Sequence, residues 1–127
     1  MARPKTHQTQ SKHRQFSFEQ AQIVLPKIQS LTAQAVHEVE SCLGRLHREP
    51  EDERLRAEVH RECNRIVQSW AQEVHRLGAV VNGLWLVDFD NGEGFYCWKY
   101  PEPMIEFYHD YDAGFAGRRQ IAETRVH

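Results

Sequence analysis

Residues 17–46 read SFEQAQIVLPKIQSLTAQAVHEVESCLGRL. Apolar or small side chains recur every three or four residues from Ala21 to Leu46, which is typical of a helix with one apolar face. Ser17 and Gln20 have the spacing of a capping box, so we expect the helix to begin at this point.

A second helix is predicted after a short turn at residues 47–50. Its apolar positions again follow the helical spacing, and they are Leu55, Val59, Cys63, Ile66, Trp70, Val74 and Leu77. Gly78 follows as the expected C-terminal cap. The two helices predict an antiparallel hairpin over residues 17–77. Pro26 lacks a backbone donor and predicts a kink or a separate short first segment.

The predicted hairpin is too long for a spherical domain. A helix of about 28 residues is roughly 42 Å long, whereas a compact chain of this length has a radius of gyration near ~14 Å. The hairpin must therefore project or pack against a second copy. Because one helix pair buries only one stripe per helix, we expect a homodimer through the helices, with a four-helix bundle at its centre.

The sequence changes character after Gly78. Three segments resemble strands, namely residues 84–89, 95–100 and 104–109, and a turn-forming stretch at residues 90–94 separates the first two. The predicted fold class is therefore α+β, a long antiparallel two-helix hairpin followed by a small antiparallel β-meander over residues 84–109. A glycine- and arginine-containing turn is expected at residues 113–119.

Composition and charge limit the classes of function. The chain has 127 residues and a net charge of -2, which indicates one domain and gives no general case for binding nucleic acid. No apolar stretch approaches a membrane span. The three cysteines form no Cys-x-x-Cys pair, and with no export signal we expect a cytoplasmic protein.

The two ends are predicted to be tails around a single domain at residues 16–119. Residues 1–15 contain four basic residues and no acid, which predicts a disordered basic tail, with a nucleic-acid arm as the alternative. Residues 120–127 form the predicted C-terminal tail.

Several short stretches together resemble one protein family. They are FSFEQA and LP at residues 16–21 and 25–26, LVDF at 86–89, YCW at 96–98, EP at 102–103, and Ile105, Tyr108, His109, Asp112, Gly114, Phe115, Gly117 and Arg118. These residues are similar to the uncharacterised bacterial family called domain of unknown function 2203, over about residues 16–119. Pro101 and Asp90 depart from the family pattern at two loops. The resemblance implies the same organisation and no particular reaction.

A divalent-metal site is one candidate for the sheet. Its predicted ligands are His109 and three acids, Asp112, Glu102 and Asp88, because one imidazole with several carboxylates suits Mn, Fe or Zn. Two alternatives remain open. His109 forms a structural hydrogen bond at the strand end, or it acts as a general acid or base that Asp110 or Asp112 orients.

An anion site is the second candidate. Gly114 and Gly117 permit tight turns beside Arg118 and Arg119, so consecutive amides and two guanidinium groups would suit a phosphate or carboxylate. The alternative is a plain turn whose arginines pair with helix acids. No Gly-Lys-Ser/Thr follows, so the stretch is not a P-loop.

Other chemistries are weaker. Cys97 is either a small buried residue or, if it faces His109, a nucleophile. The aromatic residues of the sheet lack interleaved basic residues, which disfavours nucleic acid. The helix histidines lack the Glu-x-x-His spacing of di-iron bundles.

The sequence therefore predicts a non-enzymatic, self-associating interaction module. The alternative is a divalent-metal or small anionic ligand site, with hydrolysis as one use, on the sheet around His109.

Overall fold

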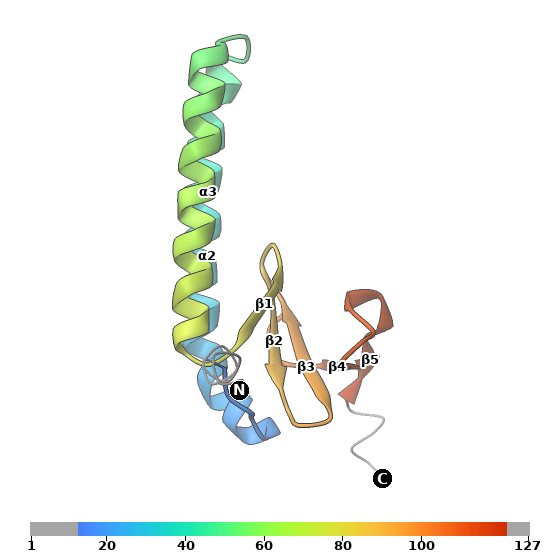
Figure 1. The fold of residues 1–127 in the computed structure, drawn as a ribbon. Helices are drawn as coiled ribbons and strands as arrows, with labels where there is room; N and C mark the ends of the chain where they lie inside the picture. The colour runs from blue at the N-terminus through green and yellow to red at the C-terminus, as the bar shows by residue number, and fades with distance from the viewer. Residues whose placement is uncertain (1–12, 122–127) are drawn as a thin grey trace, which may run out of the picture.

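The computed structural model describes residues 13–121, and it consists of two long helices followed by a five-stranded sheet (Figure 1). The helices are α2 (Phe18–Arg48) and α3 (Glu53–Arg76). The strands are β1 (Val80–Gly83), β2 (Leu86–Asp90), β3 (Gly94–Lys99), β4 (Phe107–Asp110) and β5 (Arg119–Gln120), with a 3-10 turn, η1 (Phe115–Gly117), before β5. The predicted α+β fold is confirmed.

The first helix begins where the sequence predicts. The Ser17 hydroxyl accepts a hydrogen bond from the Gln20 amide, and the Gln20 side chain accepts one from the Ser17 amide, which completes the capping box. The helix runs unbroken through Pro26, so the separate first segment does not occur. Pro26 removes a single backbone bond, while the buried side chains of Leu25 and Ile28 hold the helix on both sides of it.

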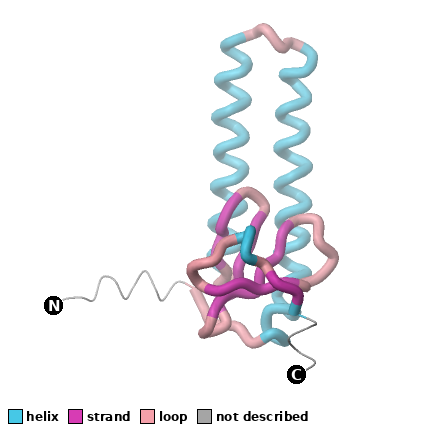
Figure 2. The backbone as a smooth tube through the Cα atoms, turned by 90° about the vertical axis from the view of Figure 1, so that its right-hand side faces the viewer, coloured by secondary structure: helices cyan, strands magenta, loops and turns pink. Residues whose placement is uncertain are grey.

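The second helix completes the hairpin. The Asp52 carboxylate accepts a hydrogen bond from the Leu55 amide at the start of α3, and Gly78 follows the helix with a φ of 98°, as the sequence predicts. Figures 1 and 2 show both helices extending well beyond the sheet. Every buried residue of α2 lies between Ala21 and Ala35, so the outer part of the hairpin has a thinner core.

The sheet is an antiparallel meander in the order β1 to β5. It has two strands that the sequence did not predict, β1 and β5, and both are short. The predicted first strand begins only at Leu86, because Trp85 has a φ of 60° and lies in the turn after β1. Within the described residues, neither helix has the length and apolarity needed to cross a membrane.

The chain before α2 also packs on the sheet. The amide of Arg14 donates to the carbonyl of Gly78, and the amide of Phe16 donates to the carbonyl of Asp90. Residues 13–15 of the predicted tail are therefore part of the fold. The predictions for residues 1–12 and 122–127 lie outside the described residues, whereas Ile121 is buried.

One face of the sheet packs on the helices. Val87, Phe89 and Trp98 point into the shared core, and the Phe16 and Phe89 rings meet edge to face at 5.3 Å. Because side chains alternate along a strand, the neighbouring positions Asp88 and Cys97 point to the opposite face. In Figure 2 the sheet lies in front of the lower half of the hairpin.

Candidate functional site

Three chemically active side chains meet on the sheet face that points away from the helices. Asp88 lies on β2 directly opposite Cys97 on β3, and His109 on β4 is paired with Phe95, two residues before Cys97. Strand alternation places all three side chains on one face. One donor atom from each lies within 4.8 Å of the other two.

The cluster is closed to solvent. Asp88 and His109 are each 1% exposed, and Cys97 is 0% exposed. A buried carboxylate is costly unless a positive charge or hydrogen bonds compensate it. The hydrogen bonds around Asp88 therefore decide what the cluster can bind.

Both ring nitrogens of His109 have a partner within hydrogen-bond distance. Its Nδ1 lies 2.8 Å from the carbonyl oxygen of Asp110, and a carbonyl only accepts, so Nδ1 carries a hydrogen. Its Nε2 lies 3.2 Å from Oδ2 of Asp88. In the neutral ring, Nε2 directs a lone pair at the carboxylate. The contact is attractive when a proton, held by the ring or by the carboxyl, or a cation lies between the two groups.

The carboxylate of Asp88 is only partly satisfied. Oδ2 accepts a hydrogen bond of 2.8 Å from the side-chain amide of Asn82. Oδ1 is buried and accepts no hydrogen bond within residues 13–121. The neighbouring Cys97 thiol is at best a weak donor. The site thus has a buried carboxylate oxygen with an unused lone pair.

Cys97 is unsuited to nucleophilic chemistry. Burial raises the pKa of its thiol to about 12; the Asp88 carboxylate adds to the rise, and Arg118 opposes it. The thiol is therefore protonated at neutral pH, and a buried thiol is not a nucleophile. A bound cation would change this, because metal ions bind the thiolate and release its proton.

The other two predicted metal ligands lie elsewhere. Glu102 accepts a hydrogen bond of 2.7 Å from Arg118 and one from the backbone amide of Lys99. Asp112 is exposed in the turn after β4. The structure thus brings together His109 and Asp88 from the predicted set and adds Cys97, whose place was visible only once the strand register was known.

In the turn predicted to bind an anion, backbone amides and the Arg118 side chain already make contacts within the protein. The amides of Gly117 and Arg118 donate to the carbonyls of Gly114 and Phe115 within the turn. The Arg118 guanidinium also stacks on the rings of Phe107 and Phe115, at 4.0 and 4.5 Å.

Arg119 is paired in the same way. Its guanidinium lies 3.3 Å from a carboxylate oxygen of Asp110 and stacks on Tyr108 at 4.8 Å. Both arginines of the turn therefore pair with acids of the sheet region, and not with helix acids. The anion site stays a prediction.

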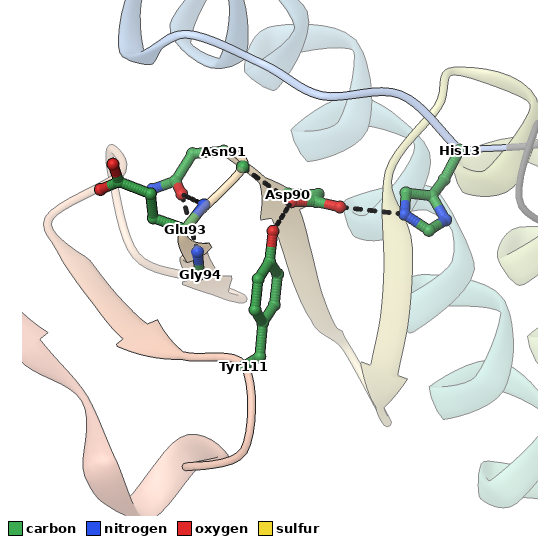
Figure 3. A network of polar contacts seen from close by, with 7 residues as sticks. His13, Asp90, Asn91, Glu93, Gly94 and Tyr111 are labelled. Atoms are coloured by element: carbon green, nitrogen blue, oxygen red, sulfur yellow. Dashed lines mark hydrogen bonds and ion pairs between the residues drawn. The ribbon is translucent and has the colours of Figure 1, made fainter.

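A polar network fixes the strand ends beside the cluster (Figure 3). Asp90 accepts hydrogen bonds from the Tyr111 hydroxyl at 2.7 Å and the Gly92 amide at 2.9 Å, and it lies 3.1 Å from the His13 ring. Burial by itself would raise the pKa of Asp90, but these contacts outweigh it and lower that pKa. The network ties β2 to the chain after β4 and so limits the movement of His109.

A surface hollow of about 300 Å³ lies nearby. Its lining residues are Asn91, Glu93, Gly94, Tyr96, Tyr108, His109, Asp110 and Ile121. Neither Asp88 nor Cys97 lines it. The hollow therefore gives no access shared by the three donors.

The comparisons with known proteins identify the family. The family described as "Uncharacterized conserved protein (DUF2203)" matches residues 14–121. The chain belongs to this family. No curated protein and no solved structure matches this DUF2203 chain. The matched residues include the hairpin and all three members of the buried cluster.

Proposed function

We propose that this DUF2203 protein binds one divalent transition-metal ion of the zinc type through Asp88, Cys97 and His109. The observation that carries the proposal is the buried Oδ1 of Asp88, which has no hydrogen-bond partner within residues 13–121 and belongs to the carboxylate whose Oδ2 lies 3.2 Å from Nε2 of His109. A cation between these donors satisfies both.

The donor set favours zinc over harder ions. One imidazole nitrogen, one carboxylate oxygen and one thiolate sulfur are the ligand types of zinc sites. Magnesium and calcium prefer oxygen ligands alone, and thiolate is a poor ligand for manganese. Two anionic ligands also balance the charge of a divalent ion in a buried site.

The surroundings are those of a supported metal site. Metal-binding histidines commonly donate their other ring hydrogen to a carbonyl, as His109 does to Asp110. The carboxylate is held in turn by Asn82. The three donors leave one of the four positions of a zinc ion unfilled by protein. Because the cluster is closed to solvent, we infer that the ion joins β2, β3 and β4 and does not act on a substrate.

Cobalt(II) is the probe for this site, since its absorption reports thiolate ligation. We expect one equivalent to produce a sulfur-to-cobalt charge-transfer band, and zinc to displace it. Cys97→Ser should abolish the band, whereas the matched variant Cys63→Ser should retain it. Asn82→Ala should weaken binding by about 10- to 100-fold, as losses of supporting hydrogen bonds do.

The acids provide a second matched pair. Asp88→Asn should prevent binding with little change in shape, and Asp112→Asn should leave binding unchanged. Retention of the thiolate band in Asp88→Asn or Cys97→Ser, or binding without any such band, would reject the site.

A second proposed function concerns the hairpin, whose outer part we propose associates with a second copy. From Val36 to the end of α2 no residue is buried, and Leu43 is 39% exposed. Half-buried apolar residues on both helices continue this surface, among them Val39, Leu46 and Leu55. A second hairpin would cover them in a four-helix arrangement.

Self-association is tested by sedimentation over a range of concentrations. We expect a dimer that Leu43→Glu converts to a monomer. The matched control is Ile23→Glu, because Ile23 is 77% exposed on the same helix but lies between Ala21 and Leu25, whose side chains are in the core shared with the sheet. A wild-type monomer at every concentration would contradict the proposal, as would equal loss of dimer in both variants.

A further inference from the structure

The outer hairpin carries the other two cysteines of the chain. Cys42 on α2 and Cys63 on α3 are both free and half-buried, whereas Cys97 is fully buried in the sheet. Half-buried thiols can meet small solutes that fully buried ones cannot.

The helix pairing sets the two cysteines opposite each other. The Trp70 ring nitrogen donates to the Thr32 hydroxyl at 2.8 Å, and further out Arg45 lies 4.0 Å from Glu58. In an antiparallel pair, positions before Arg45 face positions after Glu58. This register brings Cys42 to the turn of α3 that carries Cys63, and Cys42 is close enough to Cys63 to help raise the pKa of the Cys63 thiol.

We propose that Cys42 and Cys63 form a redox-responsive dithiol that oxidises to a disulfide across the hairpin. The oxidant is a low-molecular-weight disulfide such as oxidised glutathione. One cysteine thiolate attacks a glutathione sulfur, which forms a mixed disulfide and expels one glutathione thiolate. The other cysteine then attacks the mixed disulfide at the protein sulfur and expels the second glutathione.

The exchange balances without another reactant. Each cysteine gives up its thiol proton, the protein loses two electrons, and one oxidised glutathione becomes two molecules of reduced glutathione. The new bond closes a loop that contains the whole tip of the hairpin. It therefore fixes the outer part of the helix pair, where α2 has no buried residue.

The surroundings of Cys63 keep the reaction slow near neutral pH. Burial raises the pKa of this thiol, and Cys42 and Glu62 add to the rise. Because only the thiolate attacks, oxidation is best measured at mildly alkaline pH.

The test uses the full chain in a series of oxidised and reduced glutathione ratios, followed by acid quenching, alkylation of remaining thiols and mass analysis. Before alkylation, we expect the oxidised intact chain to be lighter than the reduced chain by the mass of two hydrogens. Trypsin should release residues 28–45 linked to residues 62–65. Cys42→Ser and Cys63→Ser should each abolish the linked peptides, and Cys97→Ser should retain them.

The oxidised wild-type chain should also unfold at a higher temperature than the reduced chain, and reductant should reverse the shift. Three results would overturn the proposal. They are glutathione adducts with no link between the two cysteines, a disulfide between separate chains, and a fully reduced chain at every glutathione ratio. The wild-type peptide map needs no variant, so poor folding of a serine variant cannot hide the answer.

Discussion

Thr32 joins the two helices at the level of the sheet. Its hydroxyl donates to the carbonyl of Ile28 at 2.7 Å and accepts from the ring nitrogen of Trp70 at 2.8 Å, and both side chains are buried. The hydroxyl thus satisfies the one polar group of a large apolar ring. Sequence periodicity identified Trp70 as a core residue but gave no sign of this partner.

Thr32→Val is expected to destabilise the protein by about 1–3 kcal/mol, because it keeps the volume but leaves the Trp70 nitrogen without an acceptor. The measurement is urea unfolding followed by circular dichroism. Ser30→Ala, on the exposed face of the same helix, should change the free energy of unfolding by less than about 0.5 kcal/mol. Equal effects of the two changes would contradict this role of Thr32.

The buried cluster shows what a sequence can predict about a site. His109 and Asp88 were both candidates because of their chemistry. Glu102 and Asp112 were added because they lie close to His109 along the chain, but Arg118 pairs with Glu102 and Asp112 lies in an exposed turn. Cys97 joins the cluster only through the register of β2 and β3, which no local pattern specifies.

At the scale of elements, Gly94 on β3 lies close to the backbone of β4. A Cβ atom added there would lie 2.6 Å from the carbonyl oxygen of His109. Backbone cannot yield to such a contact without moving the strand. Gly94 therefore permits the strand spacing that sets the position of His109.

Gly94→Ala is expected to cost about 1–3 kcal/mol of stability and to weaken cobalt binding, because the two strands must separate beside the site. Gly44→Ala is the control. Gly44 lies inside α2 with no atom near its added Cβ, so alanine should stabilise the helix by about 1 kcal/mol. Urea unfolding measures both changes, and a neutral Gly94→Ala would show that the strands are not tightly held.

The elements differ in how well the sequence predicted them. Both helices follow from long periodic patterns with clear caps, and their bounds agree closely with the structure. Strands β1 and β5 were not predicted, because four and two residues respectively carry too little alternation to detect. Each forms because it pairs with a neighbouring strand, and its own sequence has no clear alternation of apolar and polar residues.

At the scale of the whole molecule, the sheet and the hairpin carry separate proposed roles. The sheet packs on the lower half of the helices, and the outer half extends away from it (Figures 1 and 2). A metal ion in the sheet therefore acts on the base of the molecule, while the dithiol and the apolar surface act on the projecting part.

Metal binding is expected to stabilise the whole fold. An ion that binds only the folded chain adds about 2.7 kcal/mol when its concentration is 100 times its dissociation constant. This gain should raise the unfolding temperature by several degrees on adding zinc. Chelator should reverse the shift, and Cys97→Ser should show none; the same zinc-induced rise in that variant would place the ion elsewhere.

Native mass spectrometry of the full chain, loaded with zinc and then exchanged into zinc-free buffer, tests the central claim most directly. It weighs the bound ion and counts the subunits in one spectrum. We predict one zinc ion per chain in the wild type and in Asp112→Asn, and none in Asp88→Asn or Cys97→Ser. A wild-type chain without zinc, or an ion retained by both site variants, would contradict the account.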